Sequence, residues 1–358
     1  MSLKRLEIEQ FRCLQRVEIT LDPSYNLFYG ANASGKTSLL EALFLLGRGR
    51  SFRTRRLDRL VRHGEAGFRI VGWTEAAGHQ TVLGIGGSRR ATEIRIGGQA
   101  AGSAAELAAH FPPQVIDPEV HKLLEEGPHR RRRFLDWGVF HVEHTFMDVW
   151  TRYHRALRQR NAALKPGSST AAVHAWTPEL LLTGTQLAEM RRGYLELLGP
   201  ALREIGQQLL QDEVSLAYQT GWAAEESFES ALGKSADRDR RYAVTHVGPH
   251  RADVVVRVGG QAAKDRVSRG QQKLLAAALT LAQLSVQEQR QPGRSALLLD
   301  DPAAELDVGN LERLLSVVRG LRVQLFVTAL SADLPGLGTP GALFHVEHGQ
   351  IRRHSADN

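Results

Sequence analysis

The sequence has a single cysteine among its 358 residues. One thiol, Cys13, cannot form an internal disulfide or a cysteine-based metal site, so a reducing, cytoplasmic setting is expected. No run of 18 apolar residues occurs, which argues against a membrane span. The opening residues MSLKRLEIEQFR lack the apolar core of a secretory signal. We therefore expect a soluble globular protein of one large or two modest domains, with no membrane partner.

Basic side chains outnumber acidic ones, with 46 Lys and Arg against 39 Asp and Glu and a formal net charge of +7. An excess of positive charge favours a polyanionic partner such as nucleic acid. The alternative explanation is a proteome rich in arginine, because Arg far outnumbers Lys in this chain.

Arginines gather in three clusters, at residues 48–62, 130–133 and 152–160. The guanidinium fork suits DNA phosphates, and few aromatic residues interleave, so contacts to the backbone are favoured over base stacking. The candidate DNA contacts are Arg53, Arg55, Arg56, Arg59, Arg131 and Arg132. The competing interpretation is a solvated helix face or pairing with acids of the same chain, and part of the first cluster could lie at a nucleotide.

Alternating apolar residues predict strands toward both ends of the chain. The expected strands lie near 3–8, 17–21, 27–29, 254–258, 296–299 and 323–327. Short alternating runs at 68–73, 81–85 and 92–96 predict an antiparallel meander. Helices are expected at 37–46, 271–286 and 310–318, and a charged loop at 234–241.

The middle of the chain, residues 119–212, has a helical pattern with a break at 165–169. A second helix is expected to begin at Thr177-Pro178, an N-cap followed by proline. Its apolar positions, spaced by three, four and seven, predict a packing seam. The seam consists of Leu180, Leu187, Met190, Tyr194, Leu197, Ala201, Ile205 and Leu209. Gly199-Pro200 should kink the helix, and the whole is expected to be a helical hairpin.

Residues 30–37 match the phosphate-binding pattern G-x-x-x-x-G-K-[ST], between an expected strand and an expected helix. Glycines let backbone N–H groups surround a phosphate, and the helix N-terminus adds favourable partial charge. Lys36 should reach the β- and γ-phosphates, and the Thr37 hydroxyl should ligate Mg²⁺. The expected nucleotide contacts are Gly30, Ala31, Asn32, Ala33, Ser34, Gly35, Lys36, Thr37 and Ser38. The motif predicts binding of ATP or GTP.

An apolar strand at 296–299 ends in Asp300 and Asp301. A buried strand that delivers a carboxylate to its C-terminal end can hold Mg²⁺, so Asp300 is the expected metal ligand. Asp301 is the expected catalytic residue that polarises the attacking water. The alternative without a functional role is an ordinary strand followed by an acidic turn.

About 30 residues before that strand, Ser268-Arg269-Gly270-Gln271-Gln272 opens a helix. This segment resembles the signature motif of ABC ATPases, in which the serine and the helix N-terminus contact a γ-phosphate. The order of P-loop, signature, acidic strand and Glu305-Leu306-Asp307 is also that of ABC ATPases. The resemblance implies that Ser268, Gly270 and Gln271 contact ATP bound to a second copy, so that a homodimer completes the site.

Two features differ from the ABC pattern. Asp301 stands where these enzymes usually carry the longer glutamate, and Thr328 stands where a histidine often contacts the γ-phosphate. The glutamine of the Q-loop is also undetermined, with Gln114 or residues 117–119 as candidates. The missing histidine and the undetermined Q-loop glutamine predict slow turnover.

Several stretches resemble the RecF family of SMC-like ABC ATPases. They are residues 3–12, 37–42, 51–53, 127–136, 247–253 and 301–307. The resemblance runs nearly end to end. It implies a cytoplasmic, weak DNA-stimulated ATPase of recombinational repair and replication restart, which binds double-stranded DNA and single-strand gap junctions with ATP and Mg²⁺. It also implies work with RecR and RecO to load RecA.

The expected fold is α/β: an ABC-type P-loop ATPase head with an inserted α-helical hairpin, or short arm. The head is expected from residues 1–115 and 215–358, and the arm from 116–214. Two other functions stay open, an energy-coupling subunit of a transporter and a DNA scaffold that does not hydrolyse ATP. His250 and Arg251 could pack near the nucleotide site or be structural.

Overall fold

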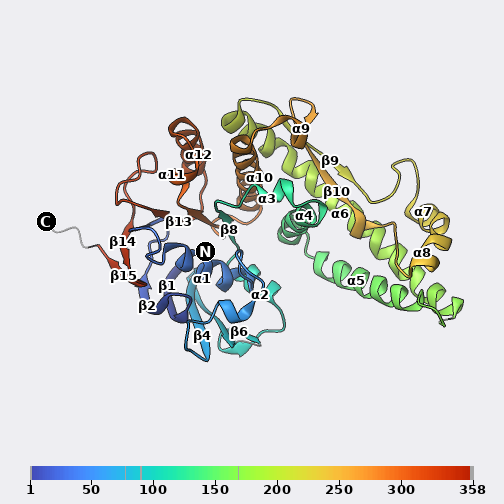
Figure 1. Ribbon diagram of the computed structural model, residues 1–358, viewed down its shortest axis with the longest axis horizontal. Helices are drawn as coiled ribbons and strands as arrows, with labels where there is room; N and C mark the ends of the chain where they lie inside the picture. Colours follow the sequence, from blue (N-terminus) through green and yellow to red (C-terminus); the bar gives the residue numbers. More distant parts are fainter. Residues whose placement is uncertain (1, 77, 89–90, 168, 355–358) are drawn as a thin grey trace. The chain divides into compact units, whose positions relative to one another are not determined.

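The computed structural model describes residues 2–76, 78–88, 91–167 and 169–354. The chain divides into two compact units, which are shown in Figure 1. We call Met1–Val120 with Ala277–Asn358 the head unit, and His121–Ala276 the arm unit. No helix among the described residues is long and apolar enough to cross a membrane.

The head unit contains an antiparallel six-stranded sheet in the order β2-β1-β4-β5-β6-β7. Its strands are β1 (Ser2–Phe11), β2 (Leu14–Thr20), β4 (Gly67–Ala76), β5 (His79–Ser88), β6 (Thr92–Ile96) and β7 (Gln99–Ala100). The buried face carries alternate residues of β1, among them Leu6 and Ile8. The predicted antiparallel meander is therefore confirmed.

A second six-stranded sheet of the head, which we call the mixed sheet, has the order β15-β14-β3-β13-β12-β8. Its strands are β3 (Tyr25–Tyr29), β8 (Pro113–Ile116), β12 (Ala296–Asp300), β13 (Gln324–Ala329), β14 (Ala342–Glu347) and β15 (Gln350–Arg353). All neighbouring pairs are parallel except β14 with β15. β12 and β13 are buried along their whole length, as expected of central parallel strands.

Helix α1 (Lys36–Arg48) packs against strands of both sheets, and its apolar residues join them into one core. Leu39, Leu43 and Leu46 are fully buried there. The other helices of the head are short or peripheral. They are η1 (Leu57–Arg59), α2 (Ala104–His110), α11 (Pro302–Glu305) and α12 (Val308–Gly320). Helix α10 (Arg269–Arg290) contains the boundary between the two units.

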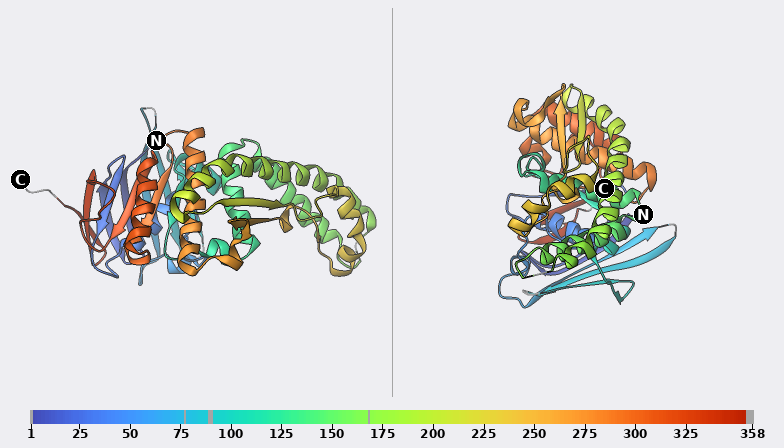
Figure 2. Two further views of the ribbon diagram at one scale, coloured as in Figure 1. Left: turned by 90° about the horizontal axis from the view of Figure 1, so that it is seen from above. Right: turned by 90° about the vertical axis from the view of Figure 1, so that its right-hand side faces the viewer.

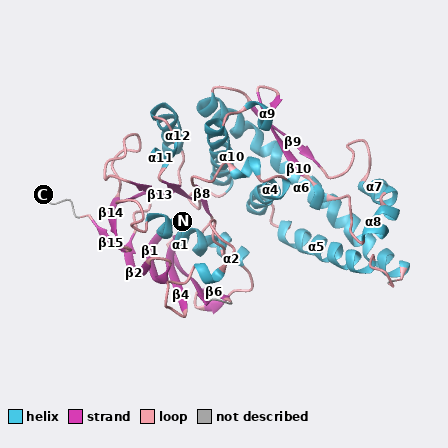
Figure 3. Ribbon diagram, viewed as in Figure 1, coloured by secondary structure: helices cyan, strands magenta, loops and turns pink. Residues whose placement is uncertain are grey.

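The arm unit combines helices with a small sheet of order β11-β10-β9 (Figure 3). Its strands are β9 (Val214–Gln219), β10 (Asp253–Val258) and β11 (Gln261–Ala262). Its helices are α3 (Lys122–Glu125), α4 (Pro128–Val142), α5 (Phe146–Ala163), α6 (Thr170–Leu210), α7 (Phe228–Lys234), α8 (Ala236–Tyr242), η2 (Pro249–Arg251) and α9 (Ala263–Arg266). α5 and α6 lie side by side, as Figure 2 shows.

The helices of the arm differ from their predicted bounds. The first stretch is three helices rather than one, because Gly127-Pro128 starts α4 and the chain leaves the helix at Glu143. The predicted start of the second helix at Thr177 is wrong: α6 begins at Thr170, where the Ser169 side chain accepts a hydrogen bond from the Ala172 N–H. Of the predicted break, Ser168 lies outside the described residues.

α6 continues through Pro178 and Pro200 to Leu210. Each internal proline costs a helix roughly 3 kcal/mol, and the buried stripe of α6 offsets this cost. The stripe differs from the predicted seam at three positions. Leu197 is 38% exposed while Leu198 is fully buried, and Met190 and Ala201 are only half-buried. The charged segment 234–241 is largely helical, in α7 and α8, and is not a loop.

The arm unit extends well beyond the predicted hairpin of residues 116–214. Strands β9 and β10 fall almost entirely within residues 215–358, a segment that the sequence pattern places in the head. They pair with each other and β9 packs on α6, so they are part of the arm unit. The sequence pattern predicted strand β10 but could not indicate which sheet it joins.

Candidate nucleotide-binding site

The parallel strands of the mixed sheet bring the motif residues to one edge. Asp300 at the end of β12 is level with Thr328 in β13, and Ala329 is level with Tyr29 at the end of β3. Because Gly30 follows Tyr29 directly, the phosphate-binding loop starts at the edge where β12 ends at Asp300 and β13 ends just after Thr328. Carboxyl ends of parallel strands are the usual position of ligand sites in α/β sheets.

The loop of residues 30–37 has a backbone that only certain residues can adopt. Gly35 precedes α1 with φ of 119°, a conformation that favours glycine. At Gly30 a Cβ atom would lie 2.1 Å from the Val346 carbonyl oxygen, so no side chain fits. Ala33 also has a positive φ, of 62°. Left-handed residues next to right-handed ones are the kind of backbone that forms anion-binding cradles of N–H groups.

Lys36 is 6% exposed, and its ammonium donates to the carbonyl oxygens of Gly30 (2.7 Å) and Ala31 (2.9 Å). Burial lowers the pKa of Lys36, and the charges of Asp301 and Asp300 partly counteract this. The lysine therefore lies inside the loop, close to both carboxylates of the acidic strand. Its partners are weak carbonyl dipoles, which phosphate oxygens can replace.

Thr37 and Asp300 meet as the sequence predicts for a magnesium site. The Thr37 hydroxyl donates to Asp300 Oδ1 at 3.0 Å, and the Thr328 hydroxyl donates to the same oxygen at 2.9 Å. Burial raises the pKa of Asp300, while hydrogen bonds from both threonines and the charges of Arg53 and Lys36 lower it. Mg²⁺ at a nucleotide is coordinated by phosphate oxygens, by waters and by only a few oxygens of the protein. One hydroxyl and one carboxylate fit that requirement. The residues fit that ion.

Asp301 has a left-handed backbone, with φ of 47°, and its N–H donates to the Thr328 hydroxyl at 2.9 Å. Burial raises the pKa of its carboxyl group, the nearby Lys36 ammonium lowers it, and the charges of Asp300 and Glu305 raise it. Thr328, which replaces the expected histidine, thus connects both aspartates. Asp307 instead caps α12, where its carboxylate accepts a hydrogen bond from the Asn310 N–H.

The two Q-loop candidates occupy different positions. Gln114 is a buried residue within β8, level with Leu297 in the interior of β12. Ile116 is level with Leu299, so Asp117 follows β8 at the same edge as Asp300. The register favours residues 117–119 over Gln114 for a position at the nucleotide.

The signature residues lie at the N-terminus of α10, and Ser268, Gly270 and Gln271 are all exposed. The Ser268 N–H donates to the Gln271 side chain at 3.0 Å, and the Gln271 N–H donates to the Ser268 hydroxyl at 3.4 Å. A Cβ at Gly270 would meet no atom of the described chain within 4 Å. The segment is ordered by its own hydrogen bonds and open on its outer side.

A buried charged cluster near the P-loop escaped sequence reasoning. Glu41 of α1 is fully buried, and Arg12 donates two hydrogen bonds to its carboxylate, at 2.8 and 2.6 Å. Ser51 donates a third, and Arg53 lies 3.6 Å from the same carboxylate. Arg53, a predicted DNA contact, therefore lies beside this cluster and acts electrostatically on Asp300.

The other candidate DNA contacts of the first cluster, Arg55, Arg56 and Arg59, are exposed, and Arg56 pairs with Asp58. The second cluster has internal partners. Arg131 donates two hydrogen bonds to the Asp253 carboxylate, and Arg132 donates to the Ala252 carbonyl oxygen at 2.6 Å. This geometry favours the structural interpretation for both.

The arginines of the third cluster differ in exposure, and His250 is partly buried. Arg152 pairs with Glu179, and Arg160 is buried against Asp239, while Arg158 is exposed. His250 lies in the arm unit, with Nδ1 2.7 Å from the Tyr153 hydroxyl. Burial lowers the pKa of His250 to about 4, so its ring is neutral and structural.

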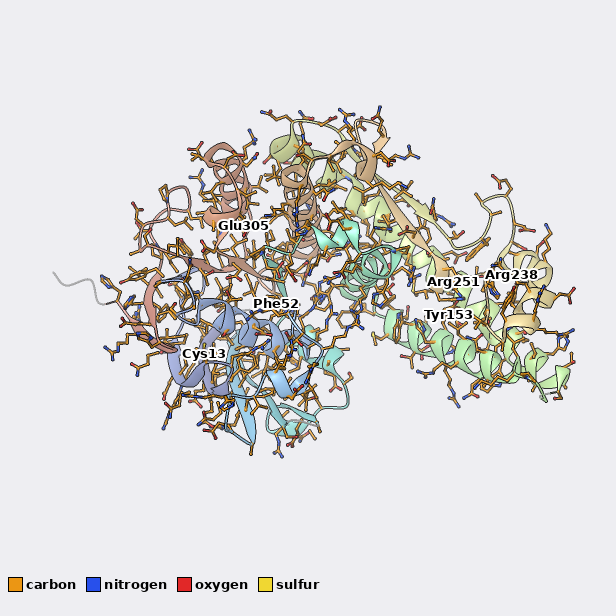
Figure 4. The ribbon with its side chains drawn as sticks, viewed as in Figure 1. Cys13, Phe52, Tyr153, Arg238, Arg251 and Glu305 are labelled. Carbon is orange, nitrogen blue, oxygen red and sulfur yellow. The ribbon has the colours of Figure 1, made fainter. Side chains whose placement is uncertain are left out.

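The turn between β14 and β15 supports the P-loop from behind, which the sequence did not indicate. The Gly349 N–H donates to the Ser34 carbonyl oxygen at 2.8 Å. A Cβ at Gly349 would lie 2.4 Å from the carbonyl oxygen of Cys13, in the β1–β2 turn that Figure 4 labels. Gly349 is buried between these two segments, and Val346 of the same hairpin contacts Gly30.

Known proteins of one family are similar to the chain over nearly its whole length. The model of the RecF/RecN/SMC N-terminal domain matches residues 2–335. The chain is 42% identical to "DNA replication and repair protein RecF" of Pseudomonas fluorescens strain Pf-5, over 98% of each chain. The same protein of Pseudomonas syringae pv. tomato is 41% identical over the same shares. The chain belongs to the RecF family of SMC-like ABC ATPases.

Solved structures agree with this assignment. A structure of the recombination mediator protein RecF with ATP is similar to this chain, with a TM-score of 0.89, 27% identity and coverage of 99% and 98% of the two chains. An SMC head bound to the C-terminal winged helix domain of ScpA has a TM-score of 0.60 at 15% identity, over 100% and 98% of the two chains, a likeness of fold alone. The predicted resemblance to the RecF family and the predicted α/β head with a helical arm are confirmed.

Proposed function

We propose that this chain is a weak, DNA-stimulated ATPase whose ATP-bound homodimer binds DNA in recombinational repair and replication restart. The observation that carries the ATPase proposal is the meeting of Lys36, Thr37 and Asp300 at one edge of the mixed sheet. The relatives named as DNA replication and repair proteins support the repair role.

The residues divide the chemistry among them. Lys36 exchanges its carbonyl partners for phosphate oxygens, while Thr37 and Asp300 hold Mg²⁺, which supplies positive charge to the phosphates. Asp301 orients a water molecule toward the terminal phosphate. Its carboxylate is one methylene shorter than the glutamate usual in ABC enzymes, and its backbone is fixed by the Thr328 hydroxyl, so turnover is slow.

The exposed signature supports a site completed by a second copy. Ser268 and Gly270 are at an open helix N-terminus, where partial positive charge favours a phosphate. A partner's γ-phosphate held there would join two heads only while ATP is intact. DNA binding by the exposed arginines of the first cluster then depends on nucleotide. In the pathway, RecR is the expected direct partner, with RecO and RecA acting beside it, on duplex DNA and single-strand gap junctions.

The proposal is tested by phosphate release with and without gapped duplex DNA, for wild type and Lys36→Arg. The guanidinium keeps the charge but is too wide for a cradle built around an ammonium. We expect slow, Mg²⁺-dependent release that gapped DNA accelerates, and no release by the variant, which still binds some ATP. Wild-type release by Lys36→Arg would contradict the assigned role of this lysine.

The alternative favoured by a specific observation is a DNA scaffold without hydrolysis, because Asp301 is short and Thr328 replaces histidine. DNA binding that requires ATP, together with no phosphate release by wild type, would support it. A transporter subunit receives no support from the RecF relatives, which match the chain end to end.

A further inference from the structure

The α7–α8 segment of the arm unit is a surface that none of the preceding functions uses. Helix α8 is fixed to α5 by a buried charged network around Asp239, which is fully buried. Its carboxylate accepts hydrogen bonds from Arg160 at 2.9 Å and from the His246 N–H at 3.0 Å. Thr245, just beyond α8, donates to the Asn161 side chain at 2.7 Å. The helix is therefore held rigidly through its inner face.

The outer face of α8 is basic and aromatic. Arg238, Arg241 and Tyr242 are at positions i, i+3 and i+4, which lie together on a helix surface. Within the described chain, neither arginine has a carboxylate within 4 Å. Figure 4 labels Arg238 on this helix. Asp237 is the exposed carboxylate of α8, and its single charge does not balance the arginines.

Tyr242 is 58% exposed, so much of its surface is open to a partner. The Arg241 guanidinium lies 5.5 Å from the ring centroid, and the His246 ring meets it edge-on at 5.7 Å. These contacts orient the ring while leaving more than half of it open. The next residue, Ala243, has a left-handed φ of 53°, a strained conformation for alanine that ends the helix there.

We propose that Arg238, Arg241 and Tyr242 form a contact surface for single-stranded nucleic acid, an inference that rests on the DNA-binding function proposed above. The two guanidinium groups bind successive phosphates, and the phenol ring stacks on an unpaired base. Aromatic rings beside basic groups are typical of single-strand sites, because bases of a duplex present no free face. An acidic protein partner would use the arginines but would not require the flat ring.

The test is fluorescence anisotropy of the full chain on a 30-nucleotide oligo-dT and on a duplex of equal length, over a salt series. The variants are Tyr242→Ala, Tyr242→Phe and Arg238→Ala/Arg241→Ala. We expect Tyr242→Ala to weaken oligo-dT binding about tenfold and Tyr242→Phe to retain it, since stacking needs only the ring. The double variant should flatten the salt dependence by about 1.4 logarithmic units, at about 0.7 per phosphate.

The matched control is Arg192→Ala/Arg203→Ala, which removes two exposed charges from α6 in the same unit. This control should bind oligo-dT as tightly as wild type does. Adding Tyr242→Ala to it should weaken oligo-dT binding by the same factor as in wild type. If oligo-dT binds the α8 variants as tightly as wild type, the α8 surface is overturned while DNA binding elsewhere stands. If wild type binds neither oligo-dT nor duplex with ATP present, both the surface and the proposed DNA-binding function fail.

Discussion

Gly349→Ala places a methyl group between the P-loop and the β1–β2 turn. The new Cβ would lie 2.4 Å from the Cys13 carbonyl oxygen, and the atom it meets is backbone, which cannot swing aside. The same residue donates to the Ser34 carbonyl oxygen at 2.8 Å. Relief of the clash must therefore move the hairpin turn, and with it a hydrogen bond that supports the P-loop.

The substitution Gly349→Ala has two effects, one on stability and one on ATP affinity. Alanine at the φ of 76° found at Gly349 costs about 1 kcal/mol of stability wherever it occurs. The clash requires a shift of about 1 Å to restore ordinary contact. A displacement of that size in a catalytic site lowers the rate about 10²-fold. Since the nucleotide is held by the loop backbone, we expect ATP affinity to fall by a factor of about 10 to 100.

The assay is ATP binding measured by calorimetry, beside thermal unfolding of the same samples. Gly338→Ala is the matched control, because its φ of 77° carries the same backbone cost and a Cβ there would meet no described atom within 4 Å. Both variants should lose the stability that the backbone conformation costs, Gly349→Ala should lose more because of the clash, and only Gly349→Ala should lose ATP affinity. Equal ATP affinity in the two variants would refute a supporting role of the hairpin.

Two further predictions concern the arginines and the buried histidine. Replacing Arg53, Arg55, Arg56 and Arg59 with alanine should flatten the salt dependence of duplex DNA binding by roughly 2 to 4 units, at about 0.9 per phosphate, since Arg53 lies beside Glu41. An unaltered slope in the folded variant would place the duplex contacts elsewhere. His250, whose pKa burial lowers to about 4, stays neutral in the folded state while the unfolded chain takes up a proton below its ordinary value of 6.5. Stability should therefore fall as pH drops from 6.5 toward 4, by at most about 1.4 kcal/mol per pH unit for this group, and His250→Gln should flatten that slope in denaturant titrations. The same slope in wild type and variant would contradict a neutral His250.

Local motifs indicate the candidate nucleotide site because each motif carries its own geometry. The full pattern G-x-x-x-x-G-K-[ST] between a strand and a helix is typical of nucleotide-binding loops, and the structure brings Lys36, Thr37 and Asp300 to one edge of the mixed sheet. The parallel register that joins them comes from buried strands whose apolar runs were visible in the sequence.

Long-range contacts were beyond the same reasoning. Nothing near Gly349 in sequence indicates that its N–H donates to the Ser34 carbonyl oxygen. In the sequence, Arg12 and Glu41 cannot be told from surface charges, because their ion pair forms only when α1 packs in the fold. Propensity also failed where packing dominates. α6 runs through two prolines because its buried stripe outweighs their cost, and α8 is helical because Asp239 is anchored by Arg160.

The central claim is that ATP joins two copies through the exposed signature. Sedimentation velocity of wild type and Ser268→Arg, each with and without Mg²⁺ and ATP, tests it most directly. A bulky cation at position 268 leaves the P-loop intact but blocks the approach of a partner's nucleotide. We predict a dimer only for wild type with ATP, while the variant binds ATP and stays monomeric. Equal dimerisation of both proteins at saturating ATP would contradict the account.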